Sequence, residues 1–395
     1  MTRQPLNVIS RRTCLASLPV MAAAMAGGRA MGETEYPGKE TLKQKLQPYF
    51  QPPAEFAGQF GPYRSPLKFA DGSLVKTPDD WKRRRSEILK TWHQRLGEWP
   101  ALIERPEVKR LETKQRDGYV EHHVQVAVSA DGKTADGYLL IPNGKGPFPA
   151  VLVPFYEPLT SIGQGKKGQG THDYGLQLVR RGFVTLSIGT PGSFENIGVD
   201  TRAALIEAGK SQRRQPLTLL AYVAANCHTA LAQTPNVNAD KIGLIGLSYG
   251  GKWSMFASCL HDKFACAVWS DPGIVFNEKN SNVNYWEPWY LGYDAKMQRK
   301  PGVPSEANPR TGLYKELIDK GEDLADLHAL MAPRPVLVSG GTEDPPRNWQ
   351  ALNHLVAVNK LLGYEERAAL TSRKTHVPTA EAIELELAFL EYWLK

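Results

Sequence analysis

The sequence GLSYG at residues 246–250 holds the residue types that point most directly to chemistry in this 395-residue chain. An apolar run at 242–245 before it predicts a buried strand, and residues 252–257 after it predict a helix. Strand, G-x-S-x-G and helix together form the pattern of a nucleophile elbow, a sharp turn that exposes a serine hydroxyl. The two glycines omit the Cβ atoms that would collide at such a bend. Ser248 is therefore the candidate nucleophile, with an ordinary glycine-rich turn as the alternative.

A serine hydroxyl is a poor nucleophile unless a base takes its proton and an acid orients that base. After a nucleophile elbow, the acid and then the base follow along the chain, on loops after later strands. Asp344, which follows an apolar strand pattern, is the expected acid, and Glu343 beside it has less support. Asp271, which follows an earlier strand pattern, is the alternative acid. His376, between the last expected strand and the final helix, is the expected base.

Acyl transfer also needs donors aimed at the negative charge that develops on the carbonyl oxygen. The backbone N–H of Tyr249, which follows the serine, is one candidate donor. We expect the second in the loop after the apolar strand pattern at 150–153, where Tyr156 is our choice. The sequence therefore predicts an oxyanion hole made by the amides of Tyr249 and Tyr156.

The elements that must position these residues are antiparallel strands followed by alternating strands and helices. Residues 120–128 alternate apolar and polar side chains, and a turn at Asp131-Gly132 joins them to a second strand pattern at 137–142. Strand patterns then occur at 150–153, 183–188, 264–269, 336–338 and 367–370, and helix patterns at 175–181, 215–232 and 380–394. This order predicts an α/β fold with a mostly parallel central sheet and helices on both faces. We expect residues 107–395 to form the catalytic domain.

The N-terminal third has a different character. A pair of arginines at 11–12 precedes an apolar stretch at 15–26 and the small residues Gly27, Gly28 and Ala30, which is the layout of a twin-arginine export signal over residues 1–30. Residues 33–106 then form an N-terminal extension, irregular to about residue 75. Thr77 begins a helix with a capping box, and apolar residues at helical spacing continue to residue 96. We therefore expect a protein exported to the periplasm or outside the cell.

The composition limits the partners and cofactors. A net charge of +7 permits a polyanionic partner, but lysines and arginines are scattered, and the tight run at 82–85 lies on a predicted helix, so no nucleic-acid binding is expected. The apolar stretch at 15–26 is too short for a stable membrane anchor. Cys227, Cys259 and Cys266 are expected as buried thiols, with a Cys259–Cys266 bridge as the alternative. No metal-ligand spacing or nucleotide-binding motif predicts a cofactor, and no feature predicts an oligomeric state.

Ser248, Asp344 and His376 in this order, with the sequence APRP at 332–335 before the acid, resemble the α/β-hydrolase superfamily. Within it, the chain is similar to the dienelactone hydrolase, acetyl xylan esterase and prolyl-oligopeptidase-like branch over roughly residues 120–395. The elbow also has a partial likeness to glucuronoyl esterases, which have Ser-Arg-Asn-Gly-Lys there. This chain has Ser-Tyr-Gly-Gly-Lys at 248–252, with the lysine but without the arginine.

The resemblance implies further binding residues. Lys252 would face the hydroxyl groups of a sugar substrate, with a structural lysine at the start of the helix as the alternative. An insert at about 272–322 contains Trp286 and Trp289, whose rings could stack on a sugar or pack the insert onto the core. The expected function is an exported serine hydrolase of carboxylic esters, acting on a small-molecule or polysaccharide ester of the acetyl-xylan or glucuronoyl type. A prolyl-oligopeptidase-like peptidase and a non-catalytic glycan-binding protein are the alternatives.

Overall fold

The computed structural model describes residues 38–165, 172–191 and 199–395. The export signal expected at 1–30 lies outside the described residues, as does the beginning of the N-terminal extension. Among the helices that the structure describes, none combines the length and the hydropathy needed to cross a bilayer.

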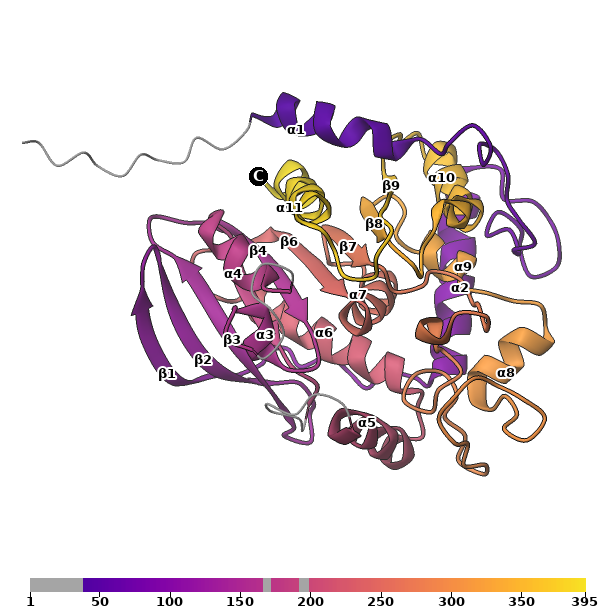
Figure 1. The fold of residues 1–395 in the computed structure, drawn as a ribbon, viewed down its shortest axis with the longest axis horizontal. Helices are drawn as coiled ribbons and strands as arrows, with labels where there is room; N and C mark the ends of the chain where they lie inside the picture. The colour runs from indigo at the N-terminus through magenta and orange to yellow at the C-terminus, as the bar shows by residue number, and fades with distance from the viewer. Residues whose placement is uncertain (1–37, 166–171, 192–198) are drawn as a thin grey trace, which may run out of the picture. The chain divides into compact units, whose positions relative to one another are not determined.

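The described residues form a nine-stranded sheet with the order β1-β2-β3-β5-β4-β6-β7-β8-β9 (Figure 1). Strands β1 to β3 pair antiparallel with one another, β3 pairs antiparallel with β5, and the remaining neighbours pair parallel. The predicted α/β fold with a mostly parallel sheet is confirmed. The strands are β1 (Val108–Arg116), β2 (Tyr119–Ala127), β3 (Thr134–Pro142), β4 (Phe148–Pro154), β5 (Val184–Ile188), β6 (Val237–Leu247), β7 (Cys266–Ser270), β8 (Val336–Gly340) and β9 (Ala368–Ser372).

Helices cover both faces of this sheet, and Figure 1 shows α11 and α6 on opposite sides. One core is built with side chains of α2, α6, α7, α9 and α10, and the other with side chains of α1, α4 and α11. The central strands are buried on both faces, as expected for parallel strands between two helical layers. The helices are α1 (Lys39–Leu46), α2 (Pro78–Leu96), α3 (Pro158–Ser161), α4 (Tyr174–Arg180), α5 (Val199–Gln212), α6 (Pro216–Ala232), α7 (Tyr249–Leu260), α8 (Gly312–Asp319), α9 (Ala325–Ala329), α10 (Trp349–Leu361) and α11 (Ala380–Leu394).

The N-terminal extension is more regular than the sequence suggested. Helix α1 lies within the stretch expected to be irregular, and its Leu42 and Leu46 are buried in the same core as side chains of α11. Two leucines one helical turn apart are too short a pattern to reveal a helix, and their burial against α11 supplies the stabilisation. Helix α2 begins at the predicted capping box, and its apolar stripe, including Trp81 and Trp92, is buried.

The cysteines are buried thiols, which was the first of the two expectations. Cys227, Cys259 and Cys266 are buried free thiols, so the alternative Cys259–Cys266 bridge is absent from the described residues. Each sulfur therefore fills core space as a small apolar group.

The capping box at the start of α2 leads to a stability prediction. Thr77 Oγ1 accepts a hydrogen bond from the Asp80 amide at 3.1 Å, which satisfies a donor at the helix end. We expect Thr77→Ala to lower the free energy of unfolding by about 1 kcal/mol, measured by urea denaturation. Ser86→Ala, at an exposed position inside the same helix, is the control and should cost nothing, because alanine has the higher helix propensity. Equal losses in both variants would contradict the role of the cap.

Candidate active site

The expected elbow is present between β6 and α7. Ser248 has φ 58° and ψ −109°, a backbone conformation that non-glycine residues rarely adopt and that is often held under strain at functional sites. A Cβ on Gly246 would lie 2.3 Å from the Gly250 carbonyl oxygen, and a Cβ on Gly250 would lie 2.3 Å from the Pro154 carbonyl oxygen. The two glycines are therefore required by the close approach of the turn to itself and to the end of β4.

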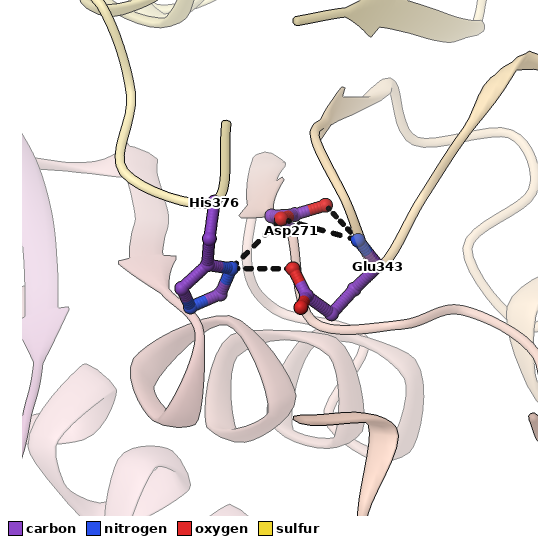
Figure 2. Close-up of side chains that lie close together, drawn as sticks. All are labelled: Asp271, Glu343 and His376. Atoms are coloured by element: carbon purple, nitrogen blue, oxygen red, sulfur yellow. Dashed lines mark hydrogen bonds and ion pairs between the residues drawn. The ribbon is translucent and has the colours of Figure 1, made fainter. Parts of the chain in front are cut away.

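His376 lies on the loop between β9 and α11, and two carboxylates face its ring (Figure 2). Its Nδ1 is 2.8 Å from Asp271 Oδ2 and 2.5 Å from Glu343 Oε2. Asp271 follows β7 and Glu343 follows β8, and these parallel neighbours end at the same edge of the sheet. Both carboxylate side chains are buried, whereas 28% of the His376 side chain is exposed. The arrangement holds one ring nitrogen firmly inside the protein.

The expected acid, Asp344, does not contact His376 in the structure. Asp344 is fully buried, and its carboxylate accepts hydrogen bonds from the amides of Gly273 at 2.7 Å and Ile274 at 2.6 Å. The Asn348 side-chain amide donates a third bond to it at 2.9 Å. Consecutive residues of this loop point in different directions, so Glu343 faces His376 while Asp344 faces the segment after β7. The two carboxylates that contact His376 are therefore those of Glu343, which had less support from the sequence, and Asp271, the alternative acid.

Asp271 is held in place by the loop that carries Glu343. Its Oδ1 accepts hydrogen bonds from the amides of Gly341 at 2.6 Å and Asp344 at 2.9 Å, and from the Glu343 amide at 3.2 Å. A Cβ on Gly341 would lie 2.5 Å from Asp271 Oδ2, so only glycine permits this close approach. With Oδ1 occupied by backbone donors, Oδ2 is left to face the imidazole.

The two acids change the titration of the histidine. Burial alone would lower the pKa of His376, but its hydrogen bonds to Asp271 and Glu343 outweigh burial and raise the pKa to about 9. Burial raises the pKa of Asp271, although the hydrogen bond to His376 acts in the opposite direction. Because three groups share one set of hydrogen bonds, their protons come off in coupled steps.

Arg373, which the sequence analysis did not single out, fixes the loop of His376. Its guanidinium donates to the His376 carbonyl oxygen at 2.7 Å and to the Thr375 carbonyl oxygen at 3.1 Å. It also donates to the Ser339 hydroxyl at 2.8 Å and, more weakly, to the Ser270 hydroxyl at 3.3 Å. The planar guanidinium thereby joins the loop of His376 to the ends of β7 and β8. No local pattern around Arg373 signals this role.

The residues expected to form the oxyanion hole lie together. Tyr249 begins α7, where backbone N–H groups have no partner within the helix, and Tyr156 comes two residues after β4, the parallel neighbour of β6. Their rings stack with centroids 4.3 Å apart and planes at 13°. The Tyr249 hydroxyl and Thr190 Oγ1 are 2.8 Å apart. Stacking fixes the two segments side by side, and the donation of both amides to an oxyanion remains a prediction.

The side chains expected to bind a sugar are buried. Lys252 is 2% exposed, and its ammonium donates to the carbonyl oxygens of Pro272 at 2.7 Å and Asn282 at 3.2 Å, not to an open cleft. Trp286 is buried edge-on against Tyr314. Trp289 is 4% exposed, and the Arg202 guanidinium lies 4.7 Å from its ring centroid. In this structure Lys252 has structural contacts and the two tryptophans pack in the interior, as the alternative interpretations expected.

Among the residues that the structure describes, the group that could hold a metal ion is again Asp271, Glu343 and His376. One ligand atom from each of Asp271, Glu343 and His376 lies within 4.8 Å of the others. The distances of 2.5 and 2.8 Å from Nδ1 to the carboxylate oxygens are those of charge-assisted hydrogen bonds. Nδ1 therefore uses its hydrogen for the acids in this arrangement.

The raised pKa of His376 can be tested without any substrate. We expect its imidazole to lose its proton above the usual value of 6.5, as followed by an NMR titration. Asp271→Asn and Glu343→Gln should each lower this pKa, because each removes a negative charge that favours the imidazolium. Glu381→Gln, an exposed carboxylate at the start of α11, is the matched control and should leave it nearly unchanged. If neither buried substitution lowers the pKa, the acids are not coupled to His376.

No protein-family model matches this sequence, and no curated protein matches it significantly. Solved structures do match. A glucuronoyl esterase from Solibacter usitatus is 16% identical with a TM-score of 0.64, over 84% of this chain and 98% of that chain.

Two further matches belong to other organisms. A glucuronoyl esterase catalytic domain from Hypocrea jecorina is 17% identical with a TM-score of 0.54, over 84% of this chain and 90% of that chain. A putative acetyl xylan esterase from Bacteroides fragilis is 14% identical with a TM-score of 0.55, over 85% of this chain and 80% of that chain. At such low identities a likeness establishes the fold, and this chain has the α/β-hydrolase fold.

Proposed function

We propose that this protein is an exported serine hydrolase that cleaves carboxylic esters of carbohydrates. The observation that carries the proposal is the pairing of His376 Nδ1 with two buried carboxylates, on a sheet edge where an elbow presents Ser248. The Ser248 amide donates to the Ser270 carbonyl oxygen at 2.8 Å, directly before Asp271, so the elbow and the acid belong to adjoining strand ends. This organisation supports acyl transfer through a serine activated by His376.

In the proposed reaction, the Ser248 hydroxyl oxygen attacks the ester carbonyl carbon while His376 Nε2 takes the hydroxyl proton. Asp271 and Glu343 hold the hydrogen on Nδ1 and stabilise the imidazolium that forms. The amides of Tyr249 and Tyr156 donate to the oxyanion. The imidazolium then protonates the leaving alcohol, which departs and leaves an acyl-enzyme. His376 next takes a proton from water, whose oxygen attacks the acyl carbon, and returns that proton to Ser248 as the acid product leaves.

The substrate class rests on two further considerations. The solved structures similar to this chain include glucuronoyl esterases and a putative acetyl xylan esterase, which supports a carbohydrate ester as substrate. Tyr249 stands where the elbow of glucuronoyl esterases has arginine, so this chain lacks that cation beside the nucleophile. Both acetyl and glucuronoyl esters are therefore the substrates to compare. Export through the twin-arginine signal expected at 1–30 would place the enzyme in the periplasm or outside the cell.

The nucleophile is tested by Ser248→Ala with 4-nitrophenyl acetate and a methyl glucuronate ester as substrates. We expect kcat on the preferred ester to fall by a factor on the order of 10⁶, as when a triad serine is removed. Ser254→Ala is the matched control on α7, because that buried hydroxyl has no hydrogen-bond partner in the described structure, and it should retain activity. A fluorophosphonate should label the wild type and not Ser248→Ala. Turnover that survives Ser248→Ala would refute the serine mechanism.

The two acids lead to a second kinetic prediction. Asp271→Asn and Glu343→Gln each leave one carboxylate on His376 Nδ1, so each should reduce kcat less than the double substitution. We expect the double substitution to lower kcat by about 10⁴-fold, because the imidazole then loses its orienting acid. The pH dependence of kcat/KM should agree, with the acidic limb above the usual histidine value in the wild type and at lower pH in each single variant, since only neutral His376 can act as base. A single variant as inactive as the double variant would show that the other carboxylate does not hold the base.

A further inference from the structure

Two buried charged residues near the candidate site, Asp344 and Lys252, do not contact His376 but contact the segment that follows Asp271. The Asp344 carboxylate accepts hydrogen bonds from the amides of Gly273 at 2.7 Å and Ile274 at 2.6 Å. The Lys252 ammonium donates to the Pro272 carbonyl oxygen at 2.7 Å. The Asp344 carboxylate thus binds the N–H groups of Gly273 and Ile274, while the Lys252 ammonium binds the carbonyl oxygen of Pro272 in the same segment.

The backbone of this segment needs to be held. Asp271 has φ 47° and Gly273 has φ 77°, so the chain leaves β7 through two residues with left-handed backbone conformations. Non-glycine residues adopt a positive φ uncommonly, and contacts from the surrounding structure hold them in it. The orientation of the Asp271 side chain toward His376 depends on this backbone. It therefore also depends on the contacts that fix residues 272–274.

Lys252 and Asp344 are also connected to Glu343. Lys252 donates to the Asn282 carbonyl oxygen at 3.2 Å, and the Asn282 side-chain amide donates to Glu343 Oε1 at 2.9 Å. Asp344 directly follows Glu343, and its own amide donates to Asp271 Oδ1 at 2.9 Å. The same two charged residues are therefore connected to both carboxylates that bind the base.

The charges compensate each other electrostatically. Burial lowers the pKa of Lys252 to about 8, and the negative charge of Asp344 is the largest effect that opposes this change. Burial raises the pKa of Asp344, which its backbone and side-chain hydrogen bonds and the Lys252 charge oppose. The rings of Tyr285 and Tyr290, with centroids 5.0 and 5.5 Å from the ammonium, enclose the cation further. Each buried charge thus offsets part of the cost of burying the other.

We propose that Lys252 and Asp344 are positioning residues that clamp residues 272–274 and thereby hold Asp271 and Glu343 against His376. The proposal rests on the serine-esterase function proposed above. It assigns Lys252 to the support of the acids and not to contact with the hydroxyl groups of the substrate. Small displacements of a catalytic group cost a large factor in rate, so the clamp should affect kcat more than KM.

The first test compares Lys252→Met with the wild type on two esters, one with a sugar and one without. If Lys252 supports the acids, kcat should fall by about 10²-fold on both 4-nitrophenyl acetate and the methyl glucuronate ester, with KM little changed. If Lys252 instead binds sugar hydroxyls, KM should rise on the glucuronate ester alone, and the proposal would be wrong. Lys360→Met, at an exposed position on α10, is the matched control and should behave as the wild type.

The second variant, Asp344→Asn, keeps the size of the side chain but turns an amide N–H₂ toward a backbone N–H. We expect the same loss of kcat on both esters, with a folded protein confirmed by its thermal unfolding. Crystal structures of both variants should show a longer distance between Asp271 and His376 than the 2.8 Å of the wild type. An unchanged distance and an unchanged kcat in a folded variant would overturn the proposal.

The clamp and the proposed function can fail separately. A wild type without serine-dependent turnover would refute the esterase function, while the distance between Asp271 and His376 in the variants would still test the clamp. Conversely, a wild type that loses turnover in Ser248→Ala, together with fully active Lys252→Met and Asp344→Asn variants, would preserve the esterase function and remove the clamp.

Discussion

The hydrogen bonds that His376 Nδ1 shares with Asp271 and Glu343 are the interaction on which the surrounding structure depends. Two carboxylates placed side by side and out of water repel each other and lose their hydration, so each needs compensating partners. Backbone amides of the β8 loop satisfy Asp271, and the side chains of Thr342 and Asn282 satisfy Glu343. These hydrogen bonds enclose both carboxylates at the ends of β7 and β8.

The parallel sheet makes such a site available, and the rest of the chain supports the sheet. Because β6, β7 and β8 run parallel as neighbours, Ser248, Asp271 and Glu343 emerge from their ends at one edge. His376 follows β9, one strand further along, and α11 begins after its loop. Helix α1 packs against α11 on one face, while α2 packs against α9 on the other. The N-terminal extension therefore belongs to the helical layers that cover the catalytic fold.

The sequence predicted those parts of the site that depend on local geometry. The elbow at Ser248, the order of the strands and the loop of His376 follow from glycines, apolar runs and their spacing. The identity of the acid could not be predicted in this way, because Glu343 and Asp344 are adjacent and only amides about 70 positions earlier in the chain decide which one turns toward the histidine. The sequence left Lys252 open between a sugar-binding and a structural role for the same reason, since its carbonyl partners at Pro272 and Asn282 are brought near by tertiary folding. Helix α1 was missed because two leucines give no detectable periodicity.

A histidine with two acids on one nitrogen has a consequence for how such sites can change over generations. In a site with one acid, any substitution of that acid leaves the base without orientation, so the acid cannot move to another strand by single steps. Here Asp271 comes from β7 and Glu343 from β8, and the loss of either carboxylate leaves the other on Nδ1. The position of the acid can therefore drift from one strand to its neighbour through intermediates that keep an oriented base.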